Sequence, residues 1–145
     1  MNLVQSIIQK LQGGSFRQVE GIASLTALIE KNKLPEVMPA AWVVSLGGDA
    51  EAPAQITGLI RQLERRRIGI VLVARVAGDA KGGKTQEIID ALEEEVLNKL
   101  LGFLPDTAID GMIYLDGRLH GINNGAILYQ MNFQCQRHLR ASNPS

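Results

Sequence analysis

Residues 78–85 read GDAKGGKT and are the clearest candidate for chemistry in the sequence. The pattern G-x-x-x-x-G-K-T is typical of a loop whose backbone N–H groups surround a nucleotide phosphate. In such a loop Lys84 would reach the outer phosphates, and the hydroxyl of Thr85 would bind Mg²⁺. A strand-like apolar run, IGIVLVARV (68–76), precedes the loop, and MIYLD (112–116) ends in an Asp that could help to hold the metal.

The same loop also has a simpler structural explanation. Gly and Asp are favoured in any turn between a strand and a helix, and Thr85 suits the start of a helix. A phosphate-binding loop of this type belongs to a sheet with several strand–helix units. Only one helix is expected after Thr85, and the remaining chain has the pattern of hairpins. We therefore keep a small nucleotide-binding enzyme as the alternative hypothesis and expect a protein with no active site, cofactor or metal.

Length and composition narrow the class of protein. A chain of 145 residues suits one compact domain, which we expect over 1–139, with 140–145 as a disordered tail. The 15 basic and 15 acidic residues balance, so nothing indicates a nucleic acid partner. No apolar run approaches the ~20 residues that span a bilayer, so we expect no membrane association. The single cysteine, Cys135, excludes an internal disulfide.

Apolar periodicity predicts three helices and several strands. The helices are expected over 3–11, 22–29 and 88–100, and the strands over 40–46, 68–76 and, as a pair, within 112–139. Two segments are harder to assign. Residues 47–58 have the composition of a long loop, and such loops are often functional. Residues 59–67 fit either a helical turn or a strand, and the order of elements favours an α+β fold.

Other groupings of reactive side chains are weak. His120, His138 and Cys135 do not have the spacing of a metal site. Glu93–Glu95 suit a solvated helix face. Arg65–Arg67 could contact phosphate, but one short basic run in a neutral chain is more often a solubilising end or a protein contact.

Short motifs in a fixed order resemble the tail terminator, or tail-completion, proteins of long-tailed bacteriophages and prophages. The motifs are FRQVEG (16–21), PAA (39–41), GDA (78–80), LLGFLPD (100–106) and GRL (117–119), and the resemblance covers about residues 1–140. The shared pattern does not include Lys84 and Thr85, so the phosphate-loop match would be incidental. The last strand is less aromatic than in relatives, with only Tyr129 and Phe133.

The resemblance implies a fold and a role. The fold would be α+β, with a mostly antiparallel sheet of about four strands and two to three helices packed on one face. Residues 59–67 would then begin a long strand that pairs with 40–46. The role would be that of a structural virion-assembly protein, a hexameric ring that caps the tail tube, stops its polymerisation and provides the surface for head joining.

The partners implied are further copies of the chain, the tail tube protein and the head–tail connector protein. The protein would lie in the virion tail after assembly in the bacterial host cytoplasm. An oligomeric scaffold of the same fold but another role is a third hypothesis.

Two polar, Gly-rich segments, 47–58 and 77–84, flank the most apolar strands, and we expect them to contact the ring or the tube. We also expect the arginines of 65–67 to pair with acidic groups across a subunit boundary. The candidate contact residues are Gly47, Gly48, Asp49, Glu51, Arg65, Arg66, Arg67 and Asp79.

Overall fold

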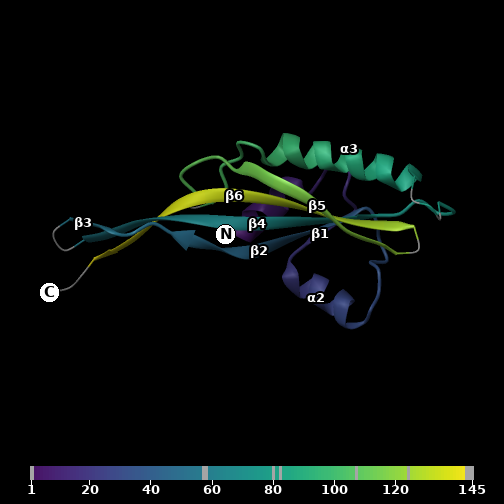
Figure 1. The fold of residues 1–145 in the computed structure, drawn as a ribbon, viewed down its shortest axis with the longest axis horizontal. Helices are drawn as coiled ribbons and strands as arrows, with labels where there is room; N and C mark the ends of the chain where they lie inside the picture. The colour runs from purple at the N-terminus through teal and green to yellow at the C-terminus, as the bar shows by residue number, and fades with distance from the viewer. Residues whose placement is uncertain are drawn as a thin grey trace.

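A computed structural model describes residues 2–56, 59–79, 81, 83–106, 108–123 and 125–142. These residues form three helices and six strands (Figure 1). In chain order the elements are α1 (Leu3–Leu11), β1 (Gln18–Glu20), α2 (Ile22–Glu30), β2 (Ala40–Ala50), β3 (Ala54–Ile56), β4 (Leu59–Ala74), α3 (Gly83–Leu100), β5 (Ile113–Asn123) and β6 (Ala126–Ser142).

The strands make one sheet in the order β1-β2-β4-β6-β5, and β3 pairs with the start of β4. β1 runs parallel to β2, and the other pairs are antiparallel. The predicted α+β fold with a mostly antiparallel sheet is therefore confirmed. The sheet has more strands than the four or so expected, because the short strands β1 and β3 add to it.

One face of the sheet is covered by α1 and α3 and contains the larger core. Ile7 and Leu11 of α1 and Ile89 and Val96 of α3 are fully buried against the sheet, where they meet residues such as Ile70. Their spacing along each helix is the three-to-four-residue repeat that the sequence shows. Asn2 fixes the start of α1, because its side chain accepts a hydrogen bond from the backbone N–H of Gln5 at 2.8 Å.

The opposite face carries α2 and a smaller core. Trp42 is 1% exposed and packs with Val44, Val71 and Val73 beneath Leu25 and Leu28 of α2. Two of the three helices therefore share one face, which we call the α1/α3 face, and the third lies on the α2 face (Figure 1).

Beyond the helices, β2, β4 and β6 continue as a narrow extension that also includes β3, which we call the arm (Figure 1). It consists of Gly48–Ile56, Leu59–Arg67 and Gln136–Ser142. The ambiguous segment 59–67 is thus the first half of the long strand β4, which pairs with both the helix-covered part and the outer part of β2. The interpretation of 47–58 as one long loop was wrong, since 47–50 complete β2 and 54–56 form β3.

β6 continues to Ser142, where it pairs with Leu59. The strand therefore includes the first part of the segment 140–145, for which a disordered tail was expected. Residues 143–145 lie outside the described residues.

Candidate functional site

The loop between β4 and α3 is closed by Thr85, whose side chain is fully buried. Its Oγ1 accepts a hydrogen bond from the backbone N–H of Val76 at 3.1 Å and donates one to the carboxylate of Asp79 at 2.9 Å. The backbone N–H of Thr85 donates to the same carboxylate at 2.7 Å. Asp79 therefore satisfies an N–H group in the first turn of α3, which otherwise has no partner within the helix.

These bonds perturb the ionisation of Asp79. The backbone N–H of Thr85 is the largest cause that holds the pKa of this carboxylate below its usual value of 3.8, with the Thr85 hydroxyl and the Lys84 backbone and charge adding to it. Partial burial acts in the opposite direction. Asp79 is thus ionised at neutral pH and bound to its own helix.

The arrangement is unlike a phosphate-binding loop. There the Thr hydroxyl would be free for Mg²⁺, but the Oγ1 of Thr85 is engaged with Val76 and Asp79. The preceding strand, β4, has antiparallel neighbours on both sides, whereas nucleotide-binding sheets of that type are parallel. The contacts of Thr85 with Val76 and Asp79 instead cap the start of α3.

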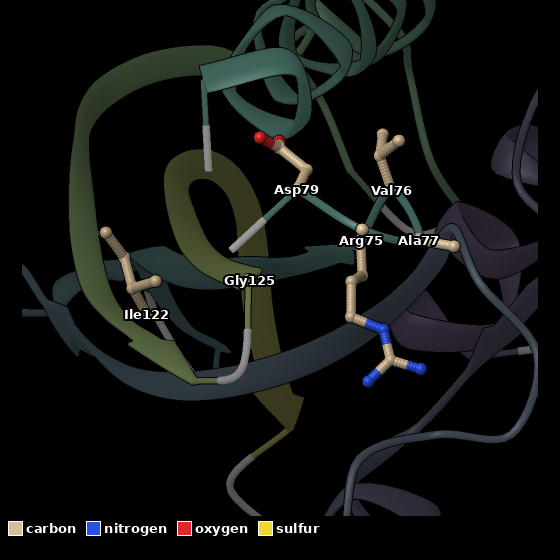
Figure 2. Close-up of a pocket in the computed structure, with 7 residues that line it drawn as sticks. Arg75, Val76, Ala77, Asp79, Ile122 and Gly125 are labelled. Carbon is tan, nitrogen blue, oxygen red and sulfur yellow. The ribbon is translucent and has the colours of Figure 1, made fainter. Parts of the chain in front are cut away.

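A shallow hollow of about 660 Å³ lies between this loop and the β5–β6 turn. Arg75, Val76, Ala77 and Asp79 line it from one side, and Ile122 from the other (Figure 2). Figure 2 shows the Asp79 carboxylate directed toward the start of α3 and the Arg75 side chain pointing away from it. The polar groups do not converge on a common point, so the hollow lacks the geometry of a small-molecule site.

The arm brings four of the predicted contact residues together. Arg65 pairs with Asp49 at 3.1 Å and with Glu51 at 2.7 Å, and Arg67 pairs with Asp49 at 3.3 Å. The partners expected across a subunit boundary are therefore found within the same chain. All four side chains are at least 36% exposed, so each pair adds little stability by itself.

Arg66 lies on the other face of β4. Its guanidinium donates to Ser45 at 2.7 Å and lies 3.8 Å from Glu64, which also accepts a hydrogen bond from Arg137 at 2.6 Å. These groups join β2, β4 and β6 where the helix-covered sheet passes into the arm.

Gly47 and Gly48 have a backbone role. The pairing of β2 with β4 shifts by one residue between Ser45 and Gly48, which is a β-bulge. Gly47 has a φ of +90°, a conformation that favours glycine. A side chain at Gly48 would overlap the carbonyl oxygen of Arg65 across the strand pair. Both positions thus favour glycine where β2 enters the arm.

Sequence reasoning missed two surfaces. Arg61 and Arg140 are directly paired across β4 and β6 in the arm, a relation that depends on strand register. Along the edge strand β5, four large apolar side chains are 43–56% exposed, namely Ile113, Leu115, Leu119 and Ile122. Their alternation would have been the available signal, but bulges after Tyr114 and Leu119 interrupt it.

Other reactive groups form no site in the part of the chain that the structure describes. There, no group of three His, Cys, Asp or Glu side chains is arranged to hold a metal ion. Cys135 is buried, and burial raises the pKa of its thiol. None of the helices described is long and apolar enough to cross a bilayer.

Comparison with known proteins agrees with the motif order. A family model described as "Phage tail terminator protein" matches residues 2–144. A chain in the solved structure described as "Virion of native gene transfer agent (GTA) particle" has a similar fold, with a TM-score of 0.53 and 13% sequence identity. The similarity covers 94% of this chain and 95% of that chain. No curated protein sequence matches the chain.

Proposed function

Because the chain belongs to the phage tail terminator family and is a structural component of the virion, we propose that it caps the tail tube as a hexameric ring. The ring stops tube polymerisation and provides the surface to which the head joins. Its partners are further copies of itself, the tail tube protein and the head–tail connector protein. The ring is built in the host cytoplasm and remains at the tail.

This function needs contact surfaces rather than catalysis. One face of the ring must bind the tube through the same kind of contact that joins successive tube rings. The other face must be unable to bind a further tube ring. The ring itself requires a head-to-tail contact between different surfaces whose rotation closes. We assign the tube contacts to the arm, with Asp49 and Glu51, and to the 77–84 turn, with Asp79.

The observation that carries the ring proposal is the exposed apolar edge along β5. Four large apolar side chains of this edge strand are each about half exposed, namely Ile113, Leu115, Leu119 and Ile122. Register with β6 places Leu119 beside Tyr129 on the α1/α3 face and Ile113 on the other face, so these side chains line both sides of the edge. Large apolar side chains exposed along a sheet edge indicate a protein contact. The two bulges disturb the backbone of β5, so the contact would use side chains rather than strand addition.

The capping function is tested by electron microscopy of tails assembled without this chain. We expect tubes of excess and variable length that lack heads. Tails of normal length joined to heads would rule the proposal out.

The ring contact is tested by Leu119→Lys, with Ile22→Lys on α2 as the matched control, since Leu119 is 52% and Ile22 57% exposed. Both variants should keep the melting temperature of the parent protein, because exposed positions contribute little to folding. Only Leu119→Lys should fail to restore normal tails to a strain that lacks the chain. Equal restoration by both variants would exclude β5 from the ring contact.

A further inference from the structure

The arm carries an excess of positive charge. It contains six arginines and three carboxylates, whereas the whole chain has 15 basic and 15 acidic residues. The part outside the arm therefore has nine basic and twelve acidic residues. A neutral chain that separates its charges in this way has two surfaces of opposite sign.

Arg61 and Arg140 are the least compensated charges of the arm. They face each other directly across β4 and β6, and like charges in that position repel. Among the described residues neither forms an ion pair, while Arg65, Arg66, Arg67 and Arg137 all do. The Nε of Arg61 is buried without a hydrogen bond, so this guanidinium depends on its terminal nitrogens for a partner.

The complementary surface lies on α3. Glu87, Asp90 and Glu94 are exposed and are separated by three and four residues, so they form one stripe along the helix. Within the described part of the chain none of them forms an ion pair, and Asp90 only accepts a hydrogen bond from Gln86 at 2.8 Å. Like charges at this spacing also repel.

The two surfaces cannot meet within one molecule. Strand alternation places Arg61 and Arg140 with Arg65 on the α2 face of the sheet, whereas α3 covers the opposite face. The arm also extends beyond the helices (Figure 1). Any contact between the two surfaces must therefore join two copies of the chain.

We propose that Arg61 and Arg140 on the arm of one copy dock against Glu87, Asp90 and Glu94 on α3 of the next copy. The contact is head to tail, as a closed ring requires. The helix α3 lies near the β5 edge, because the Tyr129 hydroxyl of β6 donates to Glu93 of α3 at 3.3 Å and Tyr129 is paired with Leu119 of β5. The charges would set the orientation and specificity of the contact more than its strength.

This inference rests on the proposed ring and is tested by charge exchange in a strain that lacks the chain. The first variant carries Arg61→Glu and Arg140→Glu, the second carries Glu87→Lys, Asp90→Lys and Glu94→Lys, and the third carries all five changes. Tail lengths are measured by electron microscopy, and circular dichroism checks that each variant folds.

Either single-surface variant should reduce the number of normal-length tails at least tenfold, because its two contact surfaces have the same sign. Co-expression of both should restore normal tails, since copies can alternate around an even-numbered ring. The five-fold variant should restore them alone. Normal tails from the first or second variant alone, or no rescue by the folded five-fold variant, would overturn the arm–α3 contact. Capping itself fails only if tails lacking the chain altogether have normal length.

A neutral variant separates docking from folding. Arg140→Gln removes the repulsion from Arg61 and should raise the melting temperature of the isolated protein while lowering the yield of normal tails. A structural role of Arg140 predicts the reverse change in melting temperature, and unchanged tail yield would overturn its role in docking.

Discussion

The two halves of β4 stay extended by different means. From Ile68 to Ala74 the strand is buried on both faces and lies between two helical layers. From Leu59 to Arg67 it is half exposed, and hydrogen-bonded neighbours with cross-strand ion pairs replace the helices. The helix-covered part of the molecule outside the arm, which we call the body, is therefore held by apolar burial, whereas the arm is held by backbone pairing and charges. Because the arm does not depend on apolar burial, its exposed polar side chains remain available to bind a partner.

The largest expected effect lies in the body. Trp42→Ala removes a side chain that is 1% exposed and packs on α2, and it also removes the hydrogen bond from Nε1 to Ser24 at 3.4 Å. The free energy of unfolding should fall by about 3–5 kcal/mol. Urea denaturation followed by circular dichroism measures it. Ile22→Ala, at a side chain 57% exposed on the same layer, is the control and should change it by less than about 0.5 kcal/mol.

Gly48→Ala should have the next largest effect, and it should be local. The new methyl group would overlap the carbonyl oxygen of Arg65, so the β2–β4 pairing in the arm must shift, at a cost of about 1–3 kcal/mol. Hydrogen exchange should increase in the arm and stay unchanged at Ile70. Gly83→Ala, where the new methyl group meets open space, is the matched control. Equal protection of the arm in both variants would show that the bulge tolerates a side chain.

Asp49→Ala tests the ion pairs of the arm. It removes the pairs with Arg65 and Arg67, but these groups are more than a third exposed, so the loss should stay below about 1 kcal/mol. The difference from the parent protein should nearly vanish in ~1 M salt, where the Debye length is about 3 Å. A loss that is independent of salt would mean that packing, and not charge, holds this side of the arm.

The smallest effect should be confined to acid pH. The lowered pKa of Asp79 means that the folded protein binds this proton less readily than the unfolded chain does. Its contribution is thus present above pH 3.8 and is lost as the pH falls through the lower, folded value. Melting temperatures of the parent and Asp79→Asn should differ at pH 6, and the difference should shrink as the pH falls below 3.8. A constant difference down to pH 2 would contradict this assignment.

The sequence predicted the body well, because its helices and buried strands repeat apolar residues with regular periods. The stripes of α1 and α3 and the apolar run at 68–74 correspond to buried side chains. Periodicity alone did not predict the arm, since 59–67 satisfies two periodicities and 47–58 contains turn-forming residues. Only the resemblance to the family implied that 59–67 begins a long strand, and the structure has that strand. The register with β6 and the bulge at Gly47 determine that these segments form strands of the arm, and neither feature can be recognised from local composition.

The same division applies to the candidate contact residues. Asp49, Glu51, Arg65 and Arg67 were selected for charge and do lie together, but their mutual pairing required the strand register. Asp79 was selected for its position in a Gly-rich turn and is bound to Thr85. Arg61 and Arg140 are 79 positions apart in the sequence, and no spacing rule connects them.

The bulge at Gly47 also changes which side chains of β2 point to each face of the sheet. Before it, the odd-numbered residues Ala41 and Val43 of β2 point to the α1/α3 face. The extra residue reverses the alternation, so that Asp49 emerges on the opposite side, opposite Arg65. Deletion of one residue here would turn the carboxylate away from both of its arginines. A single inserted residue thus determines which side of the arm is neutralised.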